Sequence, residues 1–175
     1  LVAPNSGYNL DNRCLLDAIA RGAGRFKGIA IVPLDIDRDA LLALRGQGIV
    51  GVAFNATLLG VDYYLRAAPL LRMLVELDMW VSLQVQEDQM VALRRLMEDS
   101  GVRLLIDHCG RPAPGPGVGQ AGFQALLGMA ASGRVAVKLS GFQKFSATPP
   151  PFADTRPFIE ALLARFTPDA CLWAS

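Results

Sequence analysis

Histidine and paired cysteines are nearly absent from this sequence of 175 residues. It contains one histidine, and its three cysteines, at positions 14, 109 and 171, form no CxxC pair. Zinc needs three or four ligands, so these residues alone cannot supply a His-rich zinc site. The spacing does not indicate a disulfide framework either, and we expect reduced, buried thiols, as in a cytoplasmic protein.

Long apolar segments and runs of one charge are missing as well. No uninterrupted apolar run reaches the roughly 18 residues that span a bilayer, and no charged leader with an apolar stretch indicates export. The formal net charge is +1, with Lys and Arg scattered along the chain. This distribution argues against nucleic acid or a membrane as a partner. The hydrophobic content of 52% suits a sheet covered on both faces.

Short apolar runs alternate strictly with helical patterns. We expect strands at 1–4, 28–33, 49–55, 80–85, 103–108, 135–139 and 170–175. We expect helices at 15–21, 35–48, 63–77, 89–100, 123–131 and 158–166. This order predicts one α/β domain over residues 1–175 with a parallel sheet, in the form of a (β/α)8 TIM barrel. An open doubly wound sheet is the alternative, but it would concentrate polar groups at one switch point, and here they follow nearly every strand.

Polar residues recur at the ends of these strands. Because strand residues alternate between faces, counting back from each polar end separates interior from helix-facing positions. The count collects seven side chains at the inner mouth of the barrel: Asn55, Gln84, Gln86, His108, Arg111, Lys138 and Ser140. It leaves Asp107 on the helix side, as an anchor for a loop or helix. Burying amides and a lysine without partners is unfavourable, so the cluster predicts a polar, ligand-sized cavity.

Three motifs suggest other chemistry but lack what that chemistry requires. Residues 117–122 spell GxGxxG, yet a loop separates them from the preceding strand and the next strand has no acidic end. Ser140 lacks the GxSxG elbow, because Lys138 stands where the first glycine belongs. Cys109 and His108 are adjacent in a strand and should point to opposite faces. We therefore expect neither dinucleotide binding nor a nucleophilic dyad or triad.

Several sequence blocks, LVAP, GIVGVAFN, LLIDHCGRP, VAVKLSGF and PDACLWAS, resemble the amidohydrolase superfamily. The likeness covers essentially the whole chain and is strongest to the lactone hydrolases that include 2-pyrone-4,6-dicarboxylate lactonase. It implies a barrel in which 1–4 is strand two, His108 ends strand six and 170–175 begins strand eight. The family's HxH pair on strand one and its Asp after strand eight would lie outside this chain. We therefore expect an incomplete barrel that is inactive by itself.

The resemblance also implies roles for individual residues. His108, with the HxH pair, would polarise the substrate carbonyl, and the Asp would activate water. The expected substrate-binding residues are Arg111, Lys138, Asn55, Gln84, Ser140 and Tyr8. Ala53 stands where pyrone-dicarboxylate lactonases tend to have an arginine, which leaves the exact substrate open. Gln84 stands where zinc decarboxylases of the family have a histidine. We therefore expect no cofactor, while a divalent metal in the intact protein stays open.

The expected function is hydrolysis of a carboxylated lactone or cyclic ester, in the breakdown of aromatic compounds or sugars. The partner would be a small-molecule carboxylate or lactone, and a homo-oligomer is compatible with the sequence. A metal-dependent decarboxylase or amidohydrolase on the same barrel is one alternative. A non-catalytic ligand-binding barrel is the other.

Overall fold

The computed structural model describes residues 1–3 and 6–174, and six parallel strands form its sheet. The strands are β1 Gly28–Ala30, β2 Ile49–Asn55, β3 Trp80–Gln84, β4 Arg103–Ile106, β5 Val135–Leu139 and β6 Cys171–Trp173. Their order in the sheet is their order in the chain. A doubly wound sheet would reverse this order at a switch point, so the sequential order is that of a barrel wall. The predicted barrel-type α/β fold is confirmed.

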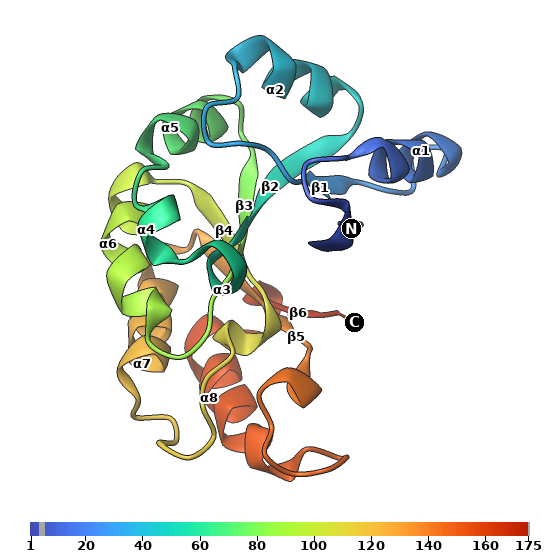
Figure 1. Ribbon diagram of the computed structural model, residues 1–175. Coiled ribbons are helices and arrows are strands. Elements are labelled where there is room, and N and C mark those ends of the chain that lie inside the picture. Colours follow the sequence, from blue (N-terminus) through green and yellow to red (C-terminus); the bar gives the residue numbers. More distant parts are fainter. Residues whose placement is uncertain (4–5, 175) are drawn as a thin grey trace.

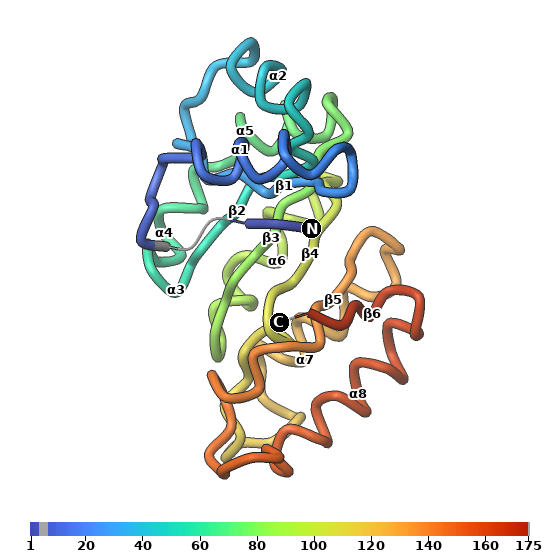
Figure 2. The backbone as a smooth tube through the Cα atoms, turned by 90° about the vertical axis from the view of Figure 1, so that its right-hand side faces the viewer, coloured from blue at the N-terminus to red at the C-terminus, as the bar shows by residue number. Residues whose placement is uncertain are grey.

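The helices follow the strands along the chain. They are α1 Arg13–Arg21, α2 Arg38–Gly46, α3 Ala56–Leu59, α4 Val61–Tyr64, α5 Ala68–Glu76, α6 Gln89–Ser100, α7 Ala121–Gly128 and α8 Arg156–Phe166. Short 3-10 turns lie between them: η1 Ser6–Tyr8, η2 His108–Gly110, η3 Met129–Ser132, η4 Phe142–Lys144, η5 Ala153–Thr155 and η6 Pro168–Ala170. In Figure 1, α5, α6 and α7 flank one side of the sheet, and the N-terminal residues lie on the other. Figure 2 looks onto that second side. No helix of the described residues has the length and apolarity to cross a membrane.

Two expected elements differ most from the structure. The helix predicted at 63–77 is divided into α4 and α5. Pro69 explains the break, because its ring clashes with the carbonyl four residues earlier and it is tolerated only in the first turn, where α5 places it. The first predicted strand is reduced to Val2, which forms an isolated parallel bridge with Gly28, and Pro4 lies outside the described residues.

The apolar core lies between the sheet and its helices. Phe54, Leu83, Leu104, Ile106 and Val137 point to this side and are at most 1% exposed. Each such side chain contributes roughly 2 kcal/mol by leaving water. The four residues of β4 therefore anchor the middle of the sheet, and they hold the start of η2 in a fixed place.

The other face of the sheet carries the polar rows. Strand pairing aligns Ala53 with Ser82, and Asn55 with Gln84. It also aligns Leu105 with Ser82 and with Ala136. Side chains aligned across parallel strands share a face. This face therefore carries small or apolar side chains in the middle of the strands and polar side chains toward their carboxyl ends.

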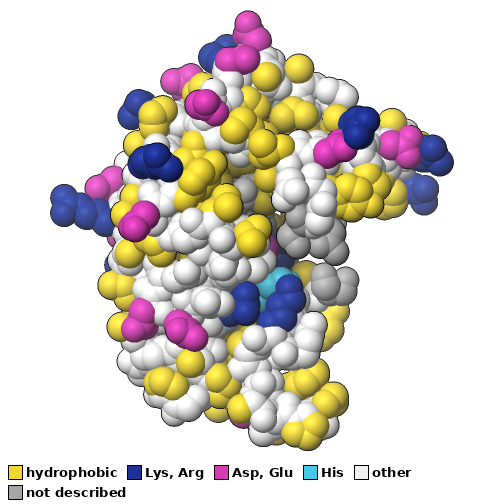
Figure 3. Space-filling model, in the orientation of Figure 1, with side chains coloured by type: hydrophobic (Ala, Val, Ile, Leu, Met, Phe, Trp, Pro, Cys, Tyr) yellow, Lys and Arg dark blue, Asp and Glu magenta, His cyan; other side chains and the backbone are white. Residues whose placement is uncertain are grey.

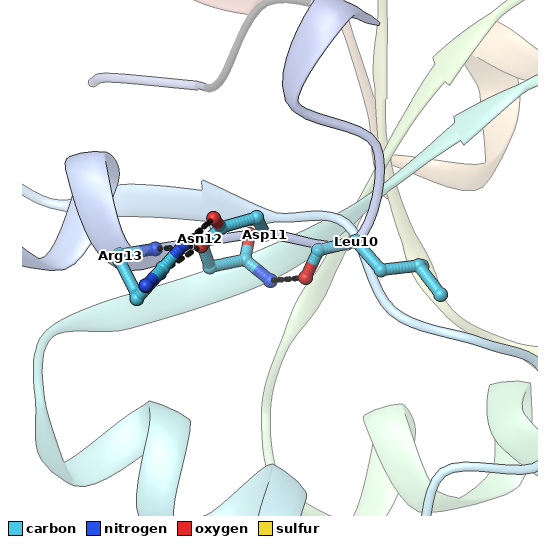
Figure 4. Close-up of polar contacts among 4 residues, drawn as sticks. All are labelled: Leu10, Asp11, Asn12 and Arg13. Carbon is cyan, nitrogen blue, oxygen red and sulfur yellow. Dashed lines mark hydrogen bonds and ion pairs between the residues drawn. The ribbon is translucent and has the colours of Figure 1, made fainter.

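A polar clamp joins the start of α1 to β1. The side-chain amide of Asn12 donates to the Ile31 carbonyl at 2.8 Å, and its oxygen accepts from the Ile31 N–H at 2.9 Å, as a strand neighbour would. The same amide lies 3.2 Å from the Leu10 carbonyl, and Arg13 pairs with Asp11 at 2.6 Å (Figure 4). The hydrogen bond from the Arg13 guanidinium lowers the pKa of Asp11 to about 2.

Candidate functional site

The site is built on the corner where β4 ends. His108, Cys109 and Arg111 all have left-handed backbone angles, with φ of 53°, 58° and 46°. Such angles cost energy for residues other than glycine and persist where the surrounding structure enforces them, often at functional sites. The corner turns the His108 ring toward the end of β5. A Cβ on Gly141 would collide with that ring, so the imidazole occupies the space a side chain at 141 would need.

Both ring nitrogens of His108 have partners. Nδ1 lies 2.9 Å from Ser140 Oγ, and Nε2 lies 3.1 Å from Lys144 Nζ. A lysine ammonium can only donate, so Nε2 accepts and the ring proton sits on Nδ1, which donates to Ser140. Burial lowers the pKa of His108, and the nearby charge of Lys144 lowers it further, while Asp107 opposes the shift. Lys138 and Arg111 act in the same direction as Lys144. The arrangement therefore holds a neutral imidazole.

Asp107 corrects the sequence-based interpretation. It was expected on the helix side, but its carboxylate lies 2.6 Å from Lys138 Nζ and accepts from Ser82 Oγ at 3.1 Å, on the polar face. The count failed because β4 ends at Ile106 and the chain turns at His108, so the alternation cannot be counted back from His108. Lys138 is placed on the interior face as predicted. Its charge is already paired with Asp107, which makes it a weaker partner for a substrate carboxylate.

The predicted amides Asn55 and Gln84 lie together and stabilise the start of α3. Asn55 Oδ1 accepts from Thr57 Oγ1 at 2.7 Å and from the Leu58 N–H at 3.2 Å. Gln84 Nε2 donates to Thr57 Oγ1 at 3.0 Å. These bonds occupy one end of each amide and leave Asn55 Nδ2 and Gln84 Oε1 without a hydrogen-bond partner among the described residues. The two residues are therefore framework groups that can still offer a polar atom to a ligand.

A cavity of about 290 Å³ opens beside this corner, lined by residues 86–87, 111–114 and 144–147. We call it the carboxyl-end cavity. Arg111 and Lys144 are its cations, and neither forms an ion pair with any residue that the structure describes. Arg111 Nε is buried and, within residues 1–3 and 6–174, has no hydrogen-bond partner. Glu87, which is exposed, is the one acidic residue of the lining. Figure 3 shows the histidine flanked by basic side chains.

The structure therefore brings most of the predicted residues together. Gln86 and Arg111 line the cavity, and His108 and Ser140 adjoin it through Lys144. Tyr8 is different: it lies in η1, is 48% exposed, and no described contact joins it to the others. Sequence reasoning missed Lys144. Its signal was its place in the loop that directly follows a barrel strand, where functional side chains of barrels are found.

Neither Cys109 nor a cluster of ligand side chains adds a reactive or metal-binding group among the described residues. Cys109 is buried, and burial raises the pKa of its thiol to about 12, so it is not a nucleophile. The expectation that Cys109 and His108 form no dyad is consistent with this. Within the described residues, no three His, Cys, Asp or Glu side chains lie close enough together to hold a metal ion.

A larger cavity, of about 520 Å³, lies at the opposite end of the sheet, beside the C-terminus of α2 and the first residues of β2, β3 and β4. We call it the amino-end cavity. Its cations are Lys27, Arg45 and Arg103. Arg103 forms an ion pair with Asp78 at 2.5 Å and covers the Trp80 ring at 4.6 Å.

Comparison with known proteins shows similarity over the whole chain. The family profile described as amidohydrolase matches residues 2–175. A 4-sulfomuconolactone hydrolase of Rhizobium radiobacter is 31% identical over 99% of this chain, and the chain spans 58% of that relative's length. A crystal structure described as a 2-pyrone-4,6-dicarboxylic acid hydrolase of Pseudomonas putida has 30% identity and a TM-score of 0.85, over 100% of this chain and 65% of that one. A similarly described structure from Acinetobacter baumannii, with citric acid bound, has 26% identity and a TM-score of 0.90, over 99% of this chain and 66% of that one.

Proposed function

The chain belongs to the amidohydrolase family, and on that basis we propose that the protein hydrolyses a lactone or other cyclic ester that carries an anionic group. The observation that carries the proposal is the pair of cations in the carboxyl-end cavity. Arg111 and Lys144 have no carboxylate partner among the described residues, and one buried N–H of Arg111 has no acceptor. A buried donor without an acceptor is costly, and an anionic ligand group would satisfy it.

The names of the similar proteins support the same chemistry. One relative is named for a sulfonated lactone, and the similar solved structures are named for a pyrone with two carboxylic acid groups. Both are cyclic esters with strong anionic substituents. A guanidinium binds such planar or tripodal anions through two hydrogen bonds, and an ammonium binds them as a point charge. Arg111 and Lys144 supply one of each.

The chemistry required is attack of water on the lactone carbonyl, followed by cleavage of the ring C–O bond to give a carboxylic acid and a hydroxyl group. Negative charge develops on the carbonyl oxygen. We assign the stabilisation of that charge to the Lys144 ammonium, which donates to the unprotonated Nε2 of His108 and is positioned by it. Ser140 holds the ring from its other side. The family resemblance implies an aspartate as the base that activates water.

Asn55, Gln84 and Lys138 complete the proposed binding face. Asn55 and Gln84 would each offer one free polar atom, and Lys138 would act through its pair with Asp107. Tyr8 remains a proposed contact that requires its loop to approach the substrate. The narrower expectations of a role in the breakdown of aromatic compounds, a cytoplasmic location and a homo-oligomer belong to this proposal as well.

Steady-state assays of the full-length protein with 4-sulfomuconolactone, 2-pyrone-4,6-dicarboxylate and an uncharged lactone test the proposal. We expect kcat/KM for at least one anionic lactone to exceed that for the uncharged lactone by about a hundredfold, the effect of two charge-assisted contacts. Failure to hydrolyse either anionic lactone, or equal rates on all three, would contradict it.

A chelator assay tests the expectation that the reaction needs no metal. We expect full activity after treatment with EDTA and less than one equivalent of bound metal in the purified protein. Loss of activity that returns with a divalent cation would instead favour the metal-dependent decarboxylase or amidohydrolase alternative.

A further inference from the structure

The loop between η4 and α8 is tied together by one carboxylate. Asp154 Oδ1 lies 2.5 Å from Ser146 Oγ and 2.9 Å from Thr148 Oγ1. Its Oδ2 accepts from the Ala147 N–H at 2.7 Å. These bonds lower the pKa of Asp154, that with the Ser146 hydroxyl most, so the group is a carboxylate at neutral pH. Three consecutive residues are thus fastened to one side chain.

Two of the three residues fastened by Asp154 belong to a wall of the carboxyl-end cavity. Ser146 and Ala147 line it directly, next to Lys144 and Phe145. Phe145 is 7% exposed and packs edge-on against Phe158 with ring centroids 6.3 Å apart. The beginning of the wall is therefore held by packing, and its continuation through residues 146–148 is held by the Asp154 carboxylate.

We propose that Asp154 is a positioning residue for the anionic end of the substrate. Its carboxylate holds residues 146–148, which follow Lys144 in the chain, and so helps Phe145 to keep Lys144 beside His108, where it can meet an anionic group. This inference rests on the proposed function for the identity of the substrate. The wall and its fastening are geometric features that any anion bound in this cavity would encounter.

The direction in which Asp154→Asn changes anion affinity distinguishes a positioning role from a purely electrostatic one. Asp154 is itself an anion near a cationic cavity, so through space it repels a bound anion. If charge were its only influence, Asp154→Asn would strengthen anion binding. If it acts by holding the wall, Asp154→Asn weakens binding, because the amide cannot accept from all three donors and its own N–H groups face the Ala147 N–H.

The experiment measures citrate binding to full-length protein by calorimetry, since citric acid is bound in the Acinetobacter baumannii structure. We expect Asp154→Asn to weaken binding about tenfold, the size of one lost charge-assisted contact. Thr148→Val, which removes one donor, should have a smaller effect in the same direction. Asp169→Asn is the control, because Asp169 is an exposed aspartate and has no hydrogen bond or ion pair among the described side chains. It should bind citrate like the unsubstituted protein.

Two additional measurements test whether Asp154 changes anion binding through the wall and Lys144. Hydrogen exchange should accelerate in the peptide 142–155 of Asp154→Asn, while the melting temperature stays within a few degrees. In the Lys144→Gln background, Asp154→Asn should cause little further loss, because both changes remove the same contact with the anion.

Unchanged or tighter citrate binding in Asp154→Asn, or losses that add fully to those of Lys144→Gln, would overturn the inference. So would a failure of the unsubstituted protein to bind citrate. If no lactone is hydrolysed but Asp154→Asn still weakens citrate binding non-additively, the proposed function fails and the positioning role stands. With an active lactonase, the variant should raise KM more than it lowers kcat.

Discussion

The two ends of the sheet each carry a cavity with cations, and they differ in whether a buried donor is left without an acceptor. The amino-end cavity is the larger, but Arg103 there has Asp78 as an ion-pair partner and an aromatic face under its guanidinium. The carboxyl-end cavity is little more than half that volume, yet Arg111 keeps a buried N–H without an acceptor and His108 is held neutral. A buried hydrogen-bond donor without an acceptor, and not the volume of the cavity, distinguishes the candidate site.

The largest expected difference between the two ends is in turnover. His108→Ala in the full-length protein should lower kcat by at least about a hundredfold, the low end for one acid–base or electrophilic group. Arg103→Gln, at the amino end, should leave kcat within about twofold because it is distant from the reacting atoms. Steady-state kinetics on the hydrolysed lactone give both values. A His108→Ala variant with normal kcat would remove His108 from the chemistry.

Breaking the Lys138–Asp107 pair should lower the free energy of unfolding more than breaking the Arg103–Asp78 pair. Lys138 and Asp107 are 17% and 19% exposed, so Lys138→Met leaves a largely buried carboxylate unpaired and should cost about 2 kcal/mol. Asp78, at the amino end, is 76% exposed, and Asp78→Asn should cost less than about 1 kcal/mol. Urea unfolding monitored by circular dichroism provides the free energies. Equal costs at the two ends would show that the interior pair is not desolvated.

Substrate affinity should respond to cations at one end only. Lys144→Gln should raise KM for an anionic lactone about tenfold and lower kcat as well, since it removes one charge-assisted contact and a cation beside the carbonyl oxygen. Arg45→Gln changes a cation of the amino-end cavity and should leave KM unchanged. A comparable rise in KM for both variants would mean that overall charge, and not the local site, attracts the substrate.

The smallest expected effect is on the pH profile. Burial and then Lys144 lower the pKa of His108, so the neutral imidazole persists below the pH at which a free histidine would be half protonated. Lys144→Gln removes one of these causes and should raise that pKa, which moves the acid limb of the kcat/KM profile to higher pH. Asp107 acts in the opposite direction, so Asp107→Asn should move the limb to lower pH. An acid limb that neither variant moves would belong to another group.

The sequence predicted the strands well where apolar runs were long and bounded. The ranges expected for β2, β5 and α6 match the structure, because each apolar pattern ends at a polar or glycine residue. The helix expected at 63–77 was too long, since periodicity alone does not register the clash that Pro69 causes. Asp107 was placed on the wrong face because the count started from His108, which lies beyond the end of β4 and has a left-handed backbone.

The sequence predicts which residues gather at the site, but it does not predict which hydrogen bonds they form. Residues at the ends of parallel strands must converge, which is why His108, Arg111 and Ser140 could be placed near one another from the sequence. Which partner each one has depends on loop conformation. The contact of Lys144 with His108 and the fastening by Asp154 both arise in the loop after β5, whose path no periodic pattern encodes.

The collision between a side chain at 141 and the His108 ring has a consequence for how this sequence can change. Gly141 has φ of 65° and its missing Cβ makes room for the imidazole, so even alanine there is strained while the histidine is present. Replacing His108 by a smaller residue relieves the collision but not the left-handed angle. A library of variants should therefore tolerate substitutions at 141 only in backgrounds that have already lost His108. Descendants of this protein that keep the histidine are expected to inherit the glycine with it.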